Sequence, residues 1–198
     1  MKIKKTHIFV TGASGFLGKN FIIRAANKGH KIFALSRSKK KNNLKNIFWI
    51  KGEIDNEFQK YLKRSHTMIH FSAAGVNNKS ISLIDAIKEN VIRPYRFLID
   101  CIQHGCKKWI IIGSASEYGL TAKSNRKLDI RSKQLPESNY EKSKLLFSKI
   151  ALNLSKIYKI NCRLMRVFNV YGKGENKQKL LSSLQQAIKK KQTIHNHF

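Results

Sequence analysis

Short apolar runs alternate along this chain with longer amphipathic stretches. The runs are rich in Ile, Val and Phe, and they predict strands at residues 7–10, 32–35, 47–50, 67–71, 109–112 and 163–167. The amphipathic stretches predict helices at 16–27, within 81–104, at 139–158 and at 178–190. Strands that are apolar on both faces and separated by helices belong to a parallel sheet covered on both sides. The pattern therefore predicts a doubly wound α/β fold, whose ligand crevice lies at the carboxyl ends of the strands.

The size and apolar content of the chain suit one domain and the start of a second. It has 198 residues, of which 41% are hydrophobic, which is enough for a packed core. No run approaches the roughly 18 consecutive apolar residues of a membrane span, and the opening segment is too short and glycine-broken for a signal-peptide core. We therefore expect a cytoplasmic protein that does not contact a membrane. Its three cysteines lack metal-ligand spacing, so we expect reduced thiols and no metal site.

The chain is strongly basic, with 40 Lys and Arg against 11 Asp and Glu and a formal net charge of +29. A charge of this size often indicates a nucleic-acid or anionic-surface partner. The lysines are scattered, however, and their runs at 39–41 and 189–191 are not interleaved with aromatic residues, as a base-stacking surface would require. We therefore predict no nucleic-acid partner, although polyanionic ligands such as dinucleotides would still be attracted.

A glycine-rich segment, TGASGFLG, follows the first predicted strand and leads into the first predicted helix. Dinucleotide sites need this arrangement, because one glycine makes the turn, one lets the backbone reach the pyrophosphate and one lets the helix pack on the strand. The amino terminus of the helix then offers N–H donors to the phosphates. Gly12, Gly15 and Gly18 have the spacing G-x-x-G-x-x-G rather than the more usual G-x-G-x-x-G.

Further motifs follow the later strands in order. Ser114 lies in IIIGSASEYG, Tyr140 and Lys144 lie in NYEKSK, and HFSA, ENVIRPYRFL and MRVFNVYG occupy 70–73, 89–98 and 165–172. Together with the glycine segment, these motifs resemble those of the extended short-chain dehydrogenase/reductases, also called NAD-dependent epimerase/dehydratases, which act mostly on nucleotide sugars. The resemblance covers nearly the whole chain and implies a Rossmann fold.

The resemblance implies a role for each matched residue. Ser114, Tyr140 and Lys144 match the catalytic serine, tyrosine and lysine. The predicted cofactor contacts are Gly12, Ser14, Gly15, Phe16, Leu17, Gly18, Ser36, Arg37, Glu53, Ile54, Phe71, Ser72, Ala73, Asn90, Tyr140, Lys144 and Val167. The predicted substrate contacts are Ser116, Tyr118 and Asn169, although Ser116 and Tyr118 could equally shape the turn after the fifth strand.

The catalytic residue types also make chemical sense in themselves. Residues four apart on a helix share a face, so Lys144 can lie beside Tyr140. The ordinary pKa of tyrosine is about 10, and a neighbouring ammonium is expected to lower it. Tyr140 could then exchange a proton while Ser114 donates a hydrogen bond to the substrate oxygen. In the family's dehydratases an acidic residue stands at the place of Ser116, so dehydration is disfavoured here.

The end of the second predicted strand bears on the choice of cofactor. An acidic residue there binds the ribose 2′-hydroxyl of NAD, whereas a basic residue accommodates the 2′-phosphate of NADP. This chain has Ser36 and Arg37 at that place and no carboxylate until Glu53. The sequence therefore favours NADP(H) over NAD(H), unless Arg37 is an ordinary solvated side chain.

Within the family, the chain most resembles the 4-ketoreductases that make CDP-abequose or CDP-paratose for bacterial O-antigens. The resemblance implies NADPH-dependent reduction of a nucleotide-linked 4-keto-6-deoxyhexose. The alternatives are a nucleotide-sugar 4-epimerase and a non-catalytic dinucleotide-binding module. The family resemblance also allows a homodimer, formed through the helix that carries Tyr140 and the helix before it.

The domain boundary is expected near residue 172. Residues 1–172 would form the NAD(P)-binding Rossmann domain, and 173–198 would begin a smaller substrate-binding domain. Members of the family are commonly longer, so the chain looks truncated at its carboxyl end. We therefore expect weak or absent turnover by this chain.

Overall fold

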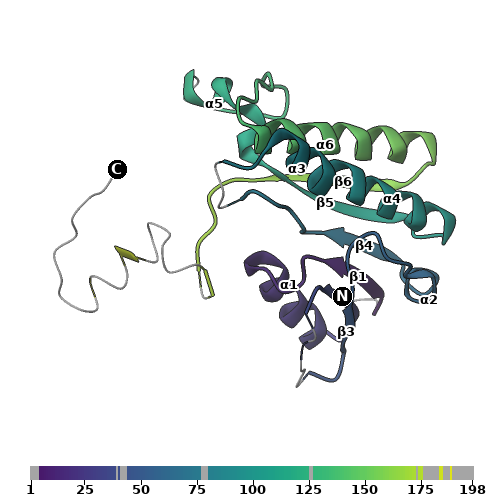
Figure 1. Ribbon diagram of the computed structural model, residues 1–198. Coiled ribbons are helices and arrows are strands. Elements are labelled where there is room, and N and C mark those ends of the chain that lie inside the picture. The colour runs from purple at the N-terminus through teal and green to yellow at the C-terminus, as the bar shows by residue number, and fades with distance from the viewer. Residues whose placement is uncertain are drawn as a thin grey trace. The chain divides into compact units, whose positions relative to one another are not determined.

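The first part of the chain forms a six-stranded parallel sheet (Figure 1). The computed structural model describes residues 5–38, 40, 44–76, 80–124, 127–172, 174–175, 183–184 and 188. The strands are β1 (His7–Thr11), β2 (Lys31–Ser36), β3 (Ile47–Lys51), β4 (Thr67–His70), β5 (Lys108–Ser114) and β6 (Asn161–Val167). Their order is β3-β2-β1-β4-β5-β6, so the chain reverses direction across the sheet between β1 and β4. The predicted doubly wound fold is confirmed, and its crevice is expected at this reversal.

Helices connect the strands. They are α1 (Phe16–Asn27), α2 (Gln59–Leu62), α3 (Leu83–Ile87), the π-helix η1 (Lys88–Ile92), α4 (Arg93–Gln103), the 3₁₀-helix η2 (Ala115–Tyr118), α5 (Leu120–Ser124) and α6 (Asn139–Ile157). The predicted helix at 16–27 is confirmed, and the one at 139–158 ends one residue earlier. The stretch at 81–104 contains α3, η1 and α4 in succession. The short helices α2, η2 and α5 were not predicted.

Pro94 explains why the long helical stretch changes its winding. The proline stands in the first turn of α4, directly after the π-helix. Because proline has no backbone N–H, it cannot donate to the carbonyl four residues earlier, which belongs to Asn90. A π turn at this point changes the spacing of the hydrogen bonds, and such turns are frequent at functional sites.

Alternating side chains of the strands form two cores, one on each face of the sheet. Phe9, Phe33 and Met68 point to the face that packs against Phe97 and other residues of the helices. Ile8, Val10, Ile32 and Ile69 point to the other face, where α1 contributes Ile22 and Ala25. Figure 1 shows α3, α4 and α6 lying side by side on their face of the sheet. Burial on both faces is the reason that the central strands β1, β2 and β4 are mostly apolar, whereas the edge strands β3 and β6 expose part of their side chains.

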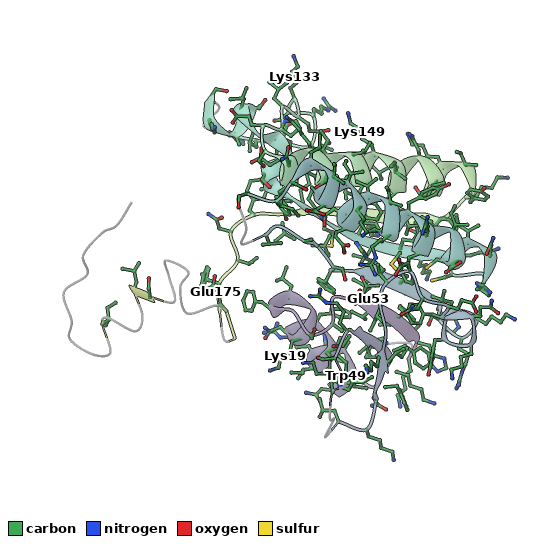
Figure 2. The ribbon with its side chains drawn as sticks, in the orientation of Figure 1. Lys19, Trp49, Glu53, Lys133, Lys149 and Glu175 are labelled. Atoms are coloured by element: carbon green, nitrogen blue, oxygen red, sulfur yellow. The ribbon has the colours of Figure 1, made fainter. Side chains whose placement is uncertain are left out.

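The basic side chains are spread over the surface, as the sequence indicates. In Figure 2, Lys19 projects from α1, whereas Lys133 and Lys149 project from the opposite part of the first unit. All three lysines are exposed. Cys101, Cys106 and Cys162 are free thiols, as expected. None of the helices among the described residues is long and apolar enough to cross a bilayer.

The chain divides into two compact units, Met1–Phe168 and Asn169–Phe198. In the second unit the N–H of Glu175 donates to the Gly172 carbonyl over 3.1 Å. The helix predicted at 178–190 lies largely outside the described residues. Within this range the structure describes Ser183, Leu184 and Ile188, and all three are helical. The two units are therefore considered separately, and the candidate site is built from the first.

Candidate functional site

A cavity of about 290 Å³ lies at the carboxyl ends of β1 to β4. Ten predicted cofactor contacts line it: Gly12, Ser14, Gly15, Ser36, Arg37, Glu53, Ile54, Phe71, Ser72 and Ala73. Four residues that were not predicted complete the lining: Leu35, Gly52, Ala74 and Glu89. Each of these four is the sequence neighbour of a predicted contact, so widening each motif by one residue would have found them.

The glycine turn brings the first strand, the first helix and the loop after β4 close together. Gly12 has a φ of +66°, and a Cβ there would lie 2.6 Å from the Ser72 nitrogen. A Cβ on Gly18 would lie 2.2 Å from the carbonyl oxygen of Gly12. Real Cβ atoms essentially never come closer than 3.0 Å to such atoms, so both positions require glycine. Gly15 also lines the cavity, and the Gly15 N–H donates to the Gly12 carbonyl over 3.1 Å.

Helix α1 begins with its amino terminus at this turn. Its N-cap is Gly15, and among the described residues no side chain caps the helix and no acidic residue lies in its first turn. Phe16, Leu17 and Gly18 form that turn but do not line the cavity. The first N–H groups and the positive end of the helix dipole are therefore available to an anion such as a phosphate.

The cavity wall formed by β2 and β3 carries both signs of charge. Arg37 is exposed, Ser36 is buried at the end of β2, and Glu53, labelled in Figure 2, follows β3. Arg93 donates to the Glu53 carboxylate over 3.0 Å and also bonds Asp55 and Glu89. The hydrogen bonds that Arg93 donates to the Asp55 carboxylate raise the pKa of the guanidinium despite its partial burial. Arg93 thus offsets the negative charge of Glu53 and Glu89, the two carboxylates in the lining.

Ser114 stands at the carboxyl end of β5 and caps the 3₁₀-helix that follows. Its Oγ lies 2.6 Å from the Oγ of Ser116 and accepts a hydrogen bond from the Ser116 N–H over 3.2 Å. Its own N–H donates to the carboxylate of Glu117 over 2.9 Å, which completes a capping box. These bonds fix the Ser114 side chain at the edge of the sheet, where Val167 of β6 is its register partner.

Tyr140 and Lys144 approach Ser114 from α6. Burial raises the pKa of the Tyr140 phenol, hydrogen bonding with Ser114 opposes this change, and the Glu117 carboxylate adds to it. The Lys144 ammonium donates to the Ile112 carbonyl over 2.8 Å. Burial lowers the pKa of Lys144 to about 8, against the opposing effect of Glu117.

The expectation that Lys144 lowers the pKa of Tyr140 is therefore wrong for this structure. The phenol is largely buried, and desolvation of its charged form is the dominant effect. The lysine directs its ammonium at a backbone carbonyl of β5. Tyr140 is consequently a protonated phenol near neutral pH, which suits a proton donor.

Asn90 connects the loop after β4 to the helix that carries Tyr140. Its amide oxygen accepts from the Ala74 N–H over 2.7 Å, and its amide nitrogen donates to the Ala74 carbonyl and to Ser143 Oγ, each over 3.0 Å. The Ser143 hydroxyl donates in turn to the Tyr140 carbonyl. Asn90 is buried and does not line the cavity. Its hydrogen bonds position the Ala74 backbone against α6, and direct contact with a cofactor stays a prediction.

The predicted substrate contacts have different surroundings. Ser116 lies beside Ser114, as described above. Tyr118 is buried, with the Arg166 guanidinium 5.2 Å from its ring centre and Phe168 beside it. These contacts suit a side chain that shapes the turn, and contact with a substrate stays a prediction. Asn169 belongs to the second unit, and its role stays a prediction.

The first unit therefore combines a glycine turn at a bare helix terminus with a Ser, Tyr and Lys cluster two strands away. A parallel sheet of this order with such a turn defines the Rossmann class of dinucleotide-binding folds. The chain belongs to the NAD dependent epimerase/dehydratase family, whose model matches residues 8–196.

Individual relatives are more distant than the family match. The chain is 26% identical over 198 residues to CDP-abequose synthase of Salmonella typhimurium, covering 98% of this chain and 62% of that protein. UDP-N-acetylglucosamine 4-epimerase from Methanobrevibacter ruminantium superposes with a TM-score of 0.85 at 22% identity, over 96% of this chain and 65% of that one. MoeE5 in complex with UDP-glucuronic acid and NAD gives a TM-score of 0.80 at 24% identity, over 91% and 60%. The chain thus spans between 60% and 65% of the length of these three relatives.

Proposed function

We propose that this chain takes part in the NADPH-dependent reduction of a nucleotide-linked 4-keto-6-deoxyhexose in bacterial polysaccharide synthesis. The observation that carries the proposal is the Ser114, Tyr140 and Lys144 cluster in the same unit as a dinucleotide-type cavity, which these three residues do not themselves line. The similarity to a CDP-abequose synthase supports the substrate class. The nucleotide-sugar substrate is expected to contact Ser116 and Asn169.

The residues around the cavity suit a nicotinamide dinucleotide. Gly15 lines the cavity without a side chain, which lets a pyrophosphate approach the backbone, and the α1 terminus favours its charge. Bound there, the reduced nicotinamide would supply a hydride to the keto carbon. Tyr140 then donates its phenolic proton to the keto oxygen, and Ser114 donates a hydrogen bond to that oxygen as negative charge develops on it. Lys144 lies one helical turn from Tyr140 and donates to the Ile112 carbonyl of β5, so it ties α6 to the strand that carries Ser114.

Tyr140 is protonated near neutral pH, as the proton donor of a ketoreduction has to be. A ketoreductase needs a protonated tyrosine, whereas oxidation of a sugar hydroxyl, the first step of a 4-epimerase, needs the phenolate as a base. The epimerase remains the second candidate, because solved epimerases share this fold.

NADP(H) is proposed as the cofactor because a cation rather than a carboxylate follows Ser36. Arg37 lines the cavity and is exposed, so its guanidinium can bind a 2′-phosphate. Calorimetric titration should therefore show tighter binding of NADPH than of NADH. Arg37→Glu should reduce or reverse this preference, whereas Lys149→Glu, an equal change of charge on the outer side of α6, should leave it unchanged. Equal affinities in the unchanged chain would contradict the assignment.

Turnover can be tested with a panel of nucleotide-linked 4-keto-6-deoxysugars. Because turnover by this chain is expected to be weak, we expect slow oxidation of NADPH, detected by its absorbance, with at least one of them. Tyr140→Phe should reduce the rate by about 100-fold or more, because it removes the proton donor. Tyr158→Phe, an equal change at an exposed position just beyond α6, should have no effect. An unchanged rate in Tyr140→Phe would eliminate the proposed chemistry.

Residues 1–172 are proposed as the NAD(P)-binding domain, with 173 onward beginning a substrate-binding domain. We also propose that copies of the chain pair through α4 and α6. These neighbouring helices expose the apolar side chains of Tyr95, Leu146 and Ile157. A paired surface of this kind would bury them from water.

A further inference from the structure

A fully buried carboxylate lies beside the predicted catalytic serine. Glu117 is 0% exposed, and its Oε1 accepts hydrogen bonds from the Ser114 N–H and the Ser148 hydroxyl, each over 2.9 Å. Its Oε2 accepts from Arg166 Nε over 2.7 Å. A buried charge is tolerated only when it is paired and hydrogen-bonded, and Glu117 has both kinds of partner.

The backbone around Glu117 accommodates this carboxylate specifically. A Cβ at Gly113 would lie 2.6 Å from Glu117 Oε1, so the preceding glycine leaves the space that the carboxylate fills. The three bonds of Glu117 reach β5, α6 and β6, which are the elements that carry Ser114, Lys144 and Val167. Glu117 therefore joins the parts of the fold on which the catalytic geometry depends.

Glu117 also supplies negative charge to the site. It raises the pKa of Lys144 against the effect of burial, and it raises the pKa of Tyr140. The other groups to consider are Arg166 of β6, which pairs with Glu117, and His70 of β4. Burial lowers the pKa of His70 to about 3, so this ring is neutral near pH 7. Glu117 is thus the negative charge, among the described residues, that acts on both Tyr140 and Lys144.

We propose that Glu117, paired with Arg166, is a positioning residue that fixes Ser114 against α6 and β6 and supplies the buried negative charge of the site. This inference rests on the function proposed above for the same site. Glu117 does not touch the substrate in this role. It acts through the Ser114 backbone, through the turn of η2 and through its charge.

The test replaces Glu117 with glutamine. Glu117→Gln keeps the shape and one acceptor oxygen for Ser114 and Ser148 but removes the negative charge. We expect the pKa of Lys144, followed by NMR of its labelled side chain, to fall, because the negative charge that raises it is removed. The basic limb of the pH profile of kcat should move to lower pH in the same variant, because Lys144 and Tyr140 both lose their protons more easily. Near neutral pH, kcat should fall about tenfold or more, with the KM for NADPH nearly unchanged.

A second variant separates positioning from folding. Glu117→Gln leaves Arg166 without its partner, which itself could destabilise the chain. The double variant Glu117→Gln/Arg166→Met removes both charges, so it should recover thermal stability while the Lys144 pKa and the pH profile stay displaced. Glu137→Gln, the same change in an ion pair with Lys123 that is exposed, is the control and should alter neither measurement.

The outcomes distinguish this inference from the proposed function. If no sugar is reduced but the Lys144 pKa falls in Glu117→Gln, the proposed reaction fails while the electrostatic role of Glu117 stands. If the double variant recovers both stability and the unaltered pH profile, Glu117 serves folding alone and the inference is wrong. An unmoved Lys144 pKa in Glu117→Gln would also overturn it.

Discussion

The glycine turn can be tested with three alanine substitutions that separate its two requirements. At Gly105, φ is +78° and an added Cβ would meet no atom within 4 Å among the described residues, so Gly105→Ala tests the left-handed backbone alone. Gly18 lies inside α1 and has no positive φ, so Gly18→Ala tests the close approach to the Gly12 carbonyl alone. Gly12→Ala combines both effects.

The structure sets the size of each effect. Placing alanine in the left-handed region costs roughly 1–2 kcal/mol, partly offset by the lower entropy of the unfolded chain, so Gly105→Ala should lose about 1 kcal/mol of stability. In Gly18→Ala the Cβ must move from 2.2 Å to the ordinary contact distance of 3.4 Å. Overpacking of this kind costs roughly 1–3 kcal/mol, against a gain of about 1 kcal/mol in helix propensity. Gly12→Ala should be the least stable of the three.

Cofactor binding should rank the variants differently from stability. Moving the glycine turn by about an ångström would break at least one hydrogen bond to a charged phosphate, worth roughly 1.5–3 kcal/mol. The dissociation constant for NADPH should therefore rise about 10- to 100-fold in Gly18→Ala and Gly12→Ala. Gly105 does not line the cavity, so Gly105→Ala should bind NADPH normally.

Urea unfolding followed by circular dichroism measures the first ranking, and calorimetric titration with NADPH measures the second. The decisive comparison is between Gly18→Ala and Gly105→Ala, whose net losses of stability are expected to be similar. If both bind NADPH with the affinity of the unchanged chain, the close packing of α1 on the glycine turn does not shape the phosphate site. The reasoning from the 2.2 Å approach would then be refuted.

Three further outcomes follow from buried or exposed groups of the first unit. Because His70 has a pKa of about 3 in the folded chain, the histidine of the unfolded chain takes up its proton first as the pH drops. The free energy of unfolding should therefore fall between about pH 6.5 and pH 3, by roughly 4 kcal/mol in total. His70→Asn should lessen this loss, which acid unfolding measures. Asn90→Ala should weaken NADPH binding in calorimetry by freeing the Ala74 loop, whereas the exposed Asn153→Ala should not. Leu146→Asp should shift sedimentation toward the monomer, and an equal shift in Phe48→Asp on the edge strand would argue against pairing through α6.

The strands and the long helices could be predicted because their burial is recorded in the residue pattern. Strands buried on both faces need mostly apolar residues, and α1 alternates the buried Ile22 and Ala25 with the exposed Lys19 and Arg24. The glycine turn could be predicted as well, because its positive φ and close contacts exclude other residue types. The roles of Ser114 and Tyr140 were predicted from the resemblance to a family rather than from the residue pattern. The fold brings these two side chains within hydrogen-bonding distance.

The polar interactions within the site could not be predicted, because they join residues far apart in the chain. The short helices α2, η2 and α5 could not be predicted either, because they span only four or five residues and a periodic pattern needs more. The bonds from Asn90 to Ser143 and from Arg166 to Glu117 cross 53 and 49 positions. The raised pKa of Tyr140 depends on burial, which the spacing of Tyr140 and Lys144 does not reveal.

The division of the chain bears on the predicted substrate contacts, of which Ser116 lies in the first unit together with the predicted cofactor contacts. Every predicted cofactor contact, from Gly12 to Val167, and each of the three predicted catalytic residues lies in the first unit. Asn169, a predicted substrate contact, lies in the second. NADPH affinity should therefore respond to changes around β1 to β4, and the KM for the nucleotide sugar should respond to Asn169. An Asn169→Ala variant that changed NADPH affinity but not this KM would place the boundary between the two functions elsewhere.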